Sequence, residues 1–468
     1  MKNRLKNIMR IMFSNITTII AGLVVAFIIP KIFSVTEYGY FRTFTLYATY
    51  IGFFSLGIID GIVLKHGGED YKDINKYKFR SYFIWYTIVH FFFTTIVIFS
   101  SLFIEGEYRY IFMLIGINII ALNFSGYFQQ ISQITQRFNE YSNRNILRSF
   151  FTIISVVIIY ILYCLNLNIN YKLYVTFILI INYALTIWYI FTYKDLVFGK
   201  HDSLKKVFKE VVTLVKVGFP LLFANLCSTL ILTIDRQFVN VLFGNEEFAL
   251  YAFAYNMVAL VTVATTAISI VLYPTLKRTT KDTLKDYYSL LIITMLCFLF
   301  GSISIYFPIV IFTNWYLPDY IESLDVFRVI LPSLVISSTI TVVMHNYYKV
   351  LNDNLRYFRK SIVILIASII INIIAYMIFK SVISISIASI ITMLIWYFYI
   401  ERYFVKNYNY RPVKNTTYML LMIVVFYGTT SIANNYIGLI LYLIIFITLT
   451  FLYYYSFLKT KFHLLKNN

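Results

Sequence analysis

An acid and a base stand side by side in a stretch that is otherwise apolar enough to cross a bilayer. Asp235 and Arg236 lie in the segment 233–255, which reads TIDRQFVNVLFGNEEFALYAFAY. Charges at membrane depth are costly, so they usually face a bundle interior or a water-filled cavity and mark a substrate or ion pathway. The alternative is an internal ion pair that only holds helices together.

A stripe of polar side chains runs along the same stretch. Its members recur every three or four residues and are Asn225, Thr229, Thr233, Arg236 and Asn240. On a helix this spacing puts them on one face, whereas Asp235 points about 100° away and is expected to meet another helix. Arg236 is therefore the better candidate for contact with a ligand.

Three further segments repeat this pattern. Their polar residues are Tyr255, Thr262, Thr266 and Ser269; Arg42, Thr45, Thr49 and Asp60; and Asn118, Ser125, Gln129, Gln133 and Gln136. On a single helix, hydroxyl and amide groups more often join helices than line a pathway. Four stripes, two of them with an arginine, favour a water-filled cavity.

The composition is that of a polytopic membrane protein. The chain has 468 residues, of which 60% are hydrophobic and 13% charged, and its mean hydropathy is +0.75. The net charge of +19 comes from basic residues between apolar segments rather than from one patch, which argues against nucleic-acid binding. Cys164, Cys227 and Cys297 have neither disulfide-framework nor zinc-site spacing, so no metal and no cofactor are expected.

The elements that position these residues are about fourteen transmembrane helices. A helix needs roughly 20 apolar residues to span the bilayer, and Pro, Gly or charged clusters interrupt the chain at about that interval. The first window is too long for a signal peptide and is expected to be retained. The windows are 11–33, 40–64, 81–104, 110–133, 149–165, 173–193, 217–243, 249–275, 287–313, 326–348, 361–379, 382–400, 416–433 and 436–457.

The basic residues predict the orientation of these helices. Most of the 40 lysines and arginines fall in every second connection, as expected for short cytoplasmic loops. This predicts that both termini are cytoplasmic. In one such connection, residues 204–215, the spacing of Val207, Val211 and Leu214 predicts a short amphipathic helix on the membrane surface.

A weak internal repeat divides the chain. A shift of 210 residues lays FSVTEYGYF (33–41) over FGNEEFALY (243–251). Six spans per unit give both units the same orientation, so we expect two parallel six-helix lobes around a central cavity. The predicted divisions are 1–200 for the first lobe, 201–414 for the second, and 415–468 for two extra C-terminal helices.

The chain resembles the polysaccharide-repeat-unit flippases of the MOP (multidrug, oligosaccharidyl-lipid, polysaccharide) exporter superfamily. The segment 233–255 resembles their seventh and eighth spans, and the residues from Pro30 to Gly39 and from Leu56 to Gly68 are similar to their first two spans and first cytoplasmic loop. The resemblance implies a MATE-like (multidrug and toxin extrusion) fold. It also implies movement of an undecaprenyl-pyrophosphate-linked oligosaccharide from the cytoplasmic to the outer leaflet of a bacterial cytoplasmic membrane, for O-antigen, capsule or exopolysaccharide synthesis.

The cavity residues suit such a substrate. Arginine offers a planar fork to phosphate oxygens, while amide and hydroxyl side chains can exchange hydrogen bonds with sugars. The expected substrate-binding residues are Arg236, Arg42, Lys31, Asn225, Thr229, Thr233, Asn240, Tyr255, Gln129 and Gln133. Asp60 and Asp235 are candidates either for coupling to H⁺ or Na⁺ or for counter-ions. The other expected partners are membrane lipids and polysaccharide polymerase machinery.

Two other classes of function remain open. A MATE-like drug/cation antiporter shares the fold, although the two extra C-terminal helices favour the lipid-linked branch. A membrane-embedded glycan polymerase or ligase would be similarly polytopic and basic. The outward-facing acids are scattered over short connections with no pair placed for acid and base work, so we expect transport and not enzymatic catalysis.

Overall fold

The computed structural model describes residues 2–277, 279–351, 353–408 and 410–466, and every regular element in them is helical. Side chains at 2–8, 354, 456–466 and scattered positions between 260 and 282, Thr266 among them, lie outside the described residues. The all-α fold is therefore confirmed. In the described part of the chain, eleven helices are long and apolar enough to cross a membrane, or twelve with one bent pair, so the expected count of about fourteen is not confirmed.

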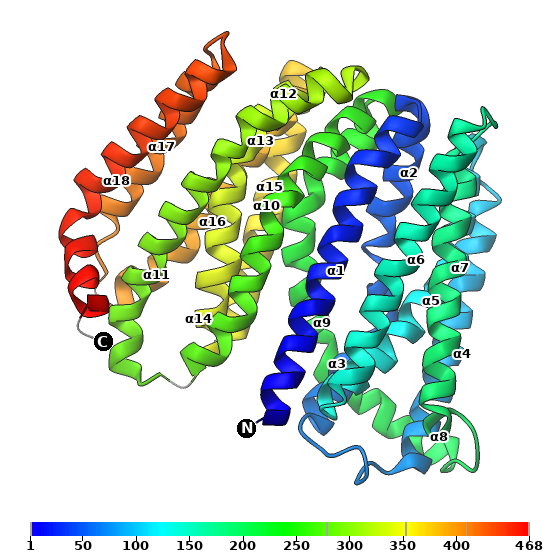
Figure 1. Cartoon of the computed structure of the whole chain (residues 1–468). Helices are drawn as coiled ribbons and strands as arrows, with labels where there is room; N and C mark the ends of the chain where they lie inside the picture. The colour runs from blue at the N-terminus through cyan, green and yellow to red at the C-terminus, as the bar shows by residue number, and fades with distance from the viewer. Residues whose placement is uncertain (1, 278, 352, 409, 467–468) are drawn as a thin grey trace. The chain divides into compact units, whose positions relative to one another are not determined.

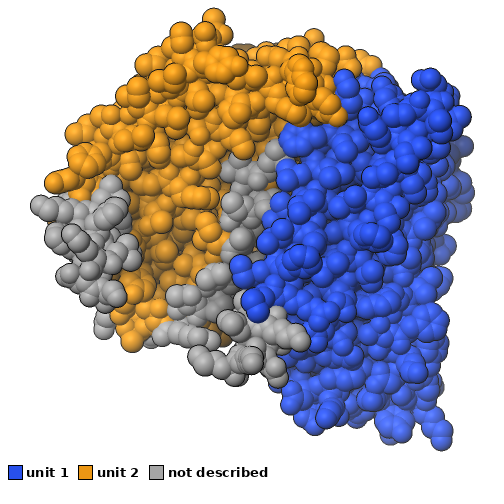
Figure 2. Space-filling view, viewed as in Figure 1, with its two compact units in different colours: residues 1–229 blue, residues 230–468 orange. Residues whose placement is uncertain are grey.

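The chain forms two compact units, Met1–Thr229 and Leu230–Asn468, which Figure 2 colours separately. The helices of the first unit are α1 (Lys2–Ile32), α2 (Val35–Ala48), η1 (Ile51–Ser55), α3 (Ile58–His66), α4 (Lys76–Ser101), α5 (Gly106–Ile134), α6 (Phe138–Cys164), α7 (Tyr171–Thr192) and α8 (Lys194–Val197). The next helix, α9 (Leu204–Leu242), contains the division between the units. In the first unit α1 packs on α6, and α5 packs on α4 and α7 (Figure 1).

The helices of the second unit are α10 (Asn245–Lys277), α11 (Lys281–Ser302), η2 (Ile303–Ile305), α12 (Tyr306–Tyr316), η3 (Pro318–Tyr320), α13 (Ser323–Ser338), η4 (Thr339–Met344), α14 (His345–Val350), α15 (Asn354–Phe379), α16 (Val382–Tyr408), α17 (Val413–Thr430) and α18 (Asn435–Lys466). Here α16 packs on α13 and α15, and α17 packs on α18. The predicted three-part division of the chain stays a prediction.

The second predicted window is not one straight helix. Residues 40–64 are divided among α2, η1 and α3. The segment Val35–Ser55, which contains α2 and η1, meets α3 at a bend of 57°. The turn occurs at Leu56 and Gly57, whose φ angles are 51° and 80°. A positive φ suits glycine because it has no Cβ, so the break lies at the Leu-Gly pair.

The connections of the first unit meet at its two ends. At one end the Tyr171 backbone N–H donates to Glu37, and Lys172 pairs with Glu107. At the other end Gly68 donates to the Ile134 carbonyl, and Tyr71 donates to Asp195. This is the alternation that the basic residues predict, although which end faces the cytoplasm stays a prediction.

The predicted amphipathic helix is not a separate element on the membrane surface. Residues 204–215 form the first part of α9, and Val207, Val211 and Leu214 are buried in a cluster with Ile58, Ile62, Phe79 and Tyr82. The prediction was wrong because the same apolar spacing suits either a lipid surface or a protein core. In the structure the core of the first unit covers this face.

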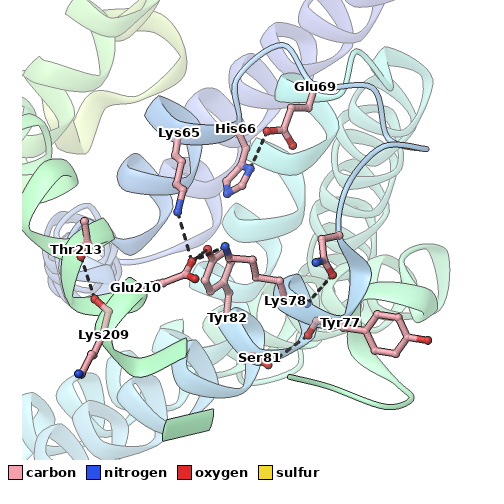
Figure 3. A network of polar contacts seen from close by, with 11 residues as sticks. Lys65, His66, Glu69, Tyr77, Lys78, Ser81, Tyr82, Lys209, Glu210 and Thr213 are labelled. Carbon is pink, nitrogen blue, oxygen red and sulfur yellow. Dashed lines mark hydrogen bonds and ion pairs between the residues drawn. The ribbon is translucent and has the colours of Figure 1, made fainter. Parts of the chain in front are cut away.

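Polar contacts fix the same part of α9 to α3 and α4. Glu210 Oε2 lies 2.6 Å from Lys78 Nζ and 3.4 Å from Lys65 Nζ, and it accepts a hydrogen bond of 2.9 Å from the Tyr82 hydroxyl (Figure 3). Trp85 Nε1 donates to the Leu204 carbonyl at 3.2 Å. The start of α9 therefore belongs to the first unit.

Candidate functional site

A polar cavity of about 320 Å³ lies in the first unit beside the bend between α2 and α3. Four residues of the predicted site line it: Asp60, Gln129, Asn225 and Thr229. The sequence pattern had placed these residues on three separate stripes. The fold brings the three helices together around one space.

The cavity has further polar residues that the helical spacing did not predict as site residues. Tyr50, Asn123 and Gln130 also line it. Asn123 Nδ2 donates to the Ile51 carbonyl at 3.1 Å and so ties η1 to α5. Because helical spacing describes one helix at a time, it gave no indication that a residue beside the Gln129 stripe meets the broken segment.

Three glycines hold the bend against α9. A Cβ at Gly57 or Gly61 would lie less than 3.0 Å from backbone atoms of Phe219 or Leu214, and a Cβ at Gly218 would lie equally close to backbone atoms of Gly57 and Gly61. Only residues without a side chain allow the two backbones to approach so closely. This crossing positions Asp60, one turn into α3, near Asn225 and Thr229 of α9.

Asp60 is the carboxylate of this cavity. Its side chain is half-buried, and it belongs to no ion pair among the described residues. The other polar lining groups are neutral amides and hydroxyls, which can both donate and accept hydrogen bonds. The cavity can therefore accommodate a cation or a hydroxyl-rich ligand.

Asp235 is the centre of a polar cluster in the second unit. Its Oδ2 accepts hydrogen bonds of 2.8 Å from the hydroxyls of Tyr251 and Ser389, and a further one from the Tyr255 hydroxyl. These partners come from α10 and α16, so Asp235 meets other helices as the 100° offset predicts. Hydrogen bonds from three hydroxyls can stabilise a buried carboxylate without a cation.

Arg236 is not paired with Asp235. The Arg236 backbone N–H donates to Asp235 Oδ1 at 2.8 Å, but no ion pair joins the two side chains in the described part of the chain. The guanidinium lies 4.3 Å from the centre of the Tyr255 ring, and its Nη2 donates to the Leu232 carbonyl at 2.7 Å. Its Nε has no hydrogen-bond partner among the described residues. Arg236 therefore has donor capacity left for a ligand.

The remaining predicted site residues have different environments. Thr233 and Asn240 are buried, whereas Lys31 and Gln133 are exposed. Arg42 is half-buried, 5.8 Å from the centre of the Tyr38 ring. The structure therefore groups four predicted residues at the cavity of the first unit, and Asp235, Arg236 and Tyr255 in the second unit.

Outside the membrane spans, Asp195 anchors the connection before α9. Its Oδ2 lies 2.6 Å from Lys76 Nζ, and its Oδ1 accepts a hydrogen bond of 2.6 Å from the Tyr71 hydroxyl. Partial burial raises the pKa of Asp195, but the hydrogen bonds from Lys76 and Tyr71 and the charge of Lys76 outweigh it, so the pKa is lowered overall. Asp195 is thus a charged structural link at neutral pH.

Comparison with known proteins gives a family match and a fold match. The model of a family described as polysaccharide biosynthesis protein matches residues 4–280. The structure resembles that of the lipid II flippase MurJ in an inward closed conformation, with a TM-score of 0.69 and 14% sequence identity over 97% of this chain and 100% of that chain. No curated protein sequence matches.

Transporters of the MOP superfamily share the fold. An inward-facing multidrug resistance MATE family transporter matches with a TM-score of 0.57 and 14% identity, covering 84% of this chain and 95% of that chain. A MOP superfamily transporter from Pyrococcus furiosus matches with a TM-score of 0.55 and 12% identity, covering 87% of this chain and 97% of that chain. These likenesses establish the fold.

Proposed function

Because the chain belongs to the polysaccharide biosynthesis protein family, we propose that it is a flippase for lipid-linked oligosaccharides. The cargo is an undecaprenyl-pyrophosphate-linked repeat unit, carried from the cytoplasmic to the outer leaflet by alternating access for O-antigen, capsule or exopolysaccharide synthesis. The family match is the observation on which the proposal rests. The multi-pass fold shared with MurJ supports it.

The cavity of the first unit suits the sugar part of such a cargo. Its lining amides and hydroxyls can donate and accept hydrogen bonds, so they can bind sugars that differ in the arrangement of their hydroxyl groups. These residues are Asn123, Gln129, Gln130, Asn225 and Thr229. The anionic head would contact Arg236, whose guanidinium stays charged and offers a planar fork. An inside-negative membrane potential favours outward movement of such a head by about 2.3 kcal/mol per charge per 100 mV.

The proposal includes an orientation and a set of partners. The protein lies in a bacterial cytoplasmic membrane with both termini on the cytoplasmic side. A polysaccharide polymerase receives the cargo at the outer leaflet. Coupling to H⁺ or Na⁺ would use Asp60, because it is a cavity carboxylate with no ion pair in the described residues. The same observation favours the second candidate function, a drug/cation antiporter.

Reconstitution in liposomes tests the proposal. A fluorescent undecaprenyl-pyrophosphate glycan is placed in both leaflets, and a membrane-impermeant reagent then destroys the label that it can reach. We expect the protein to make the inner-leaflet pool reachable, while protein-free liposomes keep about half of the label protected. A lengthened or transferred glycan would instead indicate an enzyme. Movement of an organic cation without glycan movement would indicate the antiporter.

A further inference from the structure

A carboxyl group is buried in the second unit, toward the end of α16. Glu401 is 3% exposed, and its Oε1 accepts a hydrogen bond of 3.0 Å from the hydroxyl of Tyr397, one helical turn earlier. The predicted window 382–400 ends just before Glu401, so the sequence pattern did not select this residue. In the structure α16 continues to Tyr408, and Glu401 lies inside the unit.

Phenol groups from three segments face this carboxyl group. Besides Tyr397 of α16, they are Tyr288 of α11 and Tyr410 in the connection between α16 and α17, and both interact electrostatically with Glu401. The Tyr288 ring stacks on Phe404 at 4.2 Å between ring centres and lies 5.1 Å from the Tyr410 ring. The Tyr288 hydroxyl is buried without a hydrogen-bond partner among the described residues. The surroundings of Glu401 are therefore polar but uncharged.

A chain of hydrogen bonds continues from this cluster to the two C-terminal helices. Asn415 Nδ2 of α17 donates to the Tyr410 hydroxyl at 2.6 Å, and Asn415 Oδ1 accepts from the Tyr454 hydroxyl of α18 at 2.9 Å. Asn415 and Tyr454 are both buried. The helices α17 and α18, which pack on each other (Figure 1), are thus joined to the group around Glu401.

The charged side chains of the helices that pack on α16 have other contacts. On α15, Arg356 pairs with Asp353 at 3.0 Å, and Lys360 donates to the Tyr399 carbonyl at 2.9 Å. On α13, Arg328 donates to the Tyr427 carbonyl at 3.1 Å.

The neighbouring cations of α11 and α17 do not compensate Glu401 either. Lys285 of α11 is exposed, and Lys414 of α17 lies 5.6 Å from the centre of the Tyr454 ring. No ion pair involves Glu401 in the described part of the chain. Asp235 of the same unit is stabilised by three hydroxyls, whereas one hydroxyl, that of Tyr397, donates to Glu401 among the described residues. A buried carboxylate without a cation or several donors is costly, but the same group is uncharged when it carries a proton.

We propose that Glu401 is a proton-binding site that controls the packing of α17 and α18 on the rest of the second unit. With the proton bound, the carboxyl group is neutral and the cluster of phenols stays closed. When the proton leaves for water, the carboxylate draws water into the cluster and weakens the chain from Tyr410 through Asn415 to Tyr454. The inference does not rest on the proposed function, because this packing requires no cargo. A permanently neutral, purely structural glutamic acid is the alternative explanation.

Hydrogen–deuterium exchange of the full chain tests this control. Exchange is followed by mass spectrometry from about pH 5 to about pH 9, with exchange times scaled for the intrinsic rate at each pH. We expect the amides of residues 413–430 and 435–454 to exchange roughly tenfold or more faster at the higher pH, because exchange reports local opening. The amides of α13, in the same unit, should change less. Equal protection of α17 and α18 over this range would overturn the proposal.

Variants of single acids identify the titrating group. Glu401→Gln keeps the shape of the side chain but cannot ionise, so α17 and α18 should keep their low-pH protection at every pH. The control is Asp286→Asn, because Asp286 is an exposed acid of α11, two residues before Tyr288, and the pH dependence should remain there. A pH dependence that persists in Glu401→Gln, or disappears equally in the control, would overturn the assignment to Glu401.

A second variant tests the same residue where Glu401→Gln fails to fold. Tyr397→Phe keeps the ring but removes the hydroxyl that donates to Glu401. A hydrogen bond to the charged form of an acid favours that form, so without it the loss of protection should move to higher pH. A transition that stays in place or moves to lower pH would contradict the role of Glu401.

Discussion

Three hydroxyls and the backbone N–H of Arg236, but not the Arg236 guanidinium, satisfy the carboxylate of Asp235. The Tyr251 and Ser389 hydroxyls donate to it at 2.8 Å, and the Tyr255 hydroxyl adds a third bond. Helical spacing predicted that Asp235 would meet another helix. It could not predict Ser389, which is 154 residues away, because periodicity along one helix contains no information on which helix packs beside it.

The independence of the two charges gives a transport prediction. Arg236→Ala should abolish glycan translocation at near-normal membrane levels, and Arg236→Lys should restore only part, since a point charge cannot replace a bidentate fork. Translocation in liposomes is the measurement. Adding Asp235→Ala to Arg236→Ala should not restore transport. A transport-competent double variant would mean that the two residues serve only as each other's partner.

The hydroxyl cluster gives a stability prediction. Tyr255→Phe removes one donor to Asp235 but keeps the ring beside Arg236, so we expect a loss of about 1.5–3 kcal/mol in unfolding free energy, as for a hydrogen bond to a charged group. Thermal unfolding of the purified protein measures it. Tyr427→Phe is the control because the Tyr427 hydroxyl donates to the neutral Val329 carbonyl, and its loss should be smaller. Equal stability of Tyr255→Phe and the unmodified chain would contradict the proposed role.

At the scale of elements, the sequence located helices better than it located their breaks. Most residues of each predicted window are helical, because about twenty apolar residues in a row leave little alternative in a membrane. The bend at Leu56 and Gly57 was not predicted, because one Leu-Gly pair in an apolar run does not show that the helix breaks there, and the contact of the bend with α9 joins segments far apart in the sequence. The burial of residues 204–215 in the core of the first unit was not predicted, because the apolar face of a helix does not specify what packs against it.

The close crossing of α3 and α9 predicts a large effect of a small change. Gly218→Ala would put a Cβ less than 3.0 Å from backbone atoms of Gly57 and Gly61, so the helices would have to separate. We expect a loss of about 1–3 kcal/mol or more, as for other overpacked cores. Thermal unfolding is the measurement. Gly22→Ala on α1 is the matched control, since a Cβ there has no neighbour within 4 Å, and an equally stable Gly218→Ala variant would rule out the tight crossing.

The link between α4 and the connection before α9 should depend on pH. The lowered pKa of Asp195 means that its contribution to stability is complete above its ordinary value of 3.8 and is lost as the pH falls through the lowered pKa of the folded protein. Asp195→Asn should therefore cost on the order of 1 kcal/mol at pH 7, and this difference should disappear in strong acid. Thermal unfolding of both proteins from pH 7 into strong acid, below the lowered pKa of Asp195, measures it. A pH-independent difference would show that the charge is not involved.

At the scale of the whole molecule, composition and charge distribution predicted the membrane class and the helical fold. In the first unit, the contacts of Glu37 with Tyr171 and of Tyr71 with Asp195 place alternate connections at opposite ends, as the basic residues indicated. The polar cavity could not be predicted from the sequence, because Asp60, Gln129 and Asn225 come from three distant segments. Their meeting depends on tertiary packing.

The orientation is open to a direct test. An alkaline phosphatase fused after the C-terminal residue should be inactive and a green fluorescent protein there should be fluorescent, since both report a cytoplasmic end. The phosphatase fused after Lys380, in an expected external connection, should be active. An active phosphatase at the C-terminus would contradict the cytoplasmic position of that end and an even number of membrane crossings.

The meeting of Gly57, Gly61 and Gly218 also has an evolutionary consequence. A side chain at any of the three positions would collide with the backbone of the opposite helix, so no single substitution there can be accommodated by trimming a neighbouring side chain. A substitution at one of these positions is therefore expected to be tolerated only when the other two also change. An alignment of relatives that preserve this crossing should show the three glycines kept or lost together, as a covarying group separated by about a third of the chain.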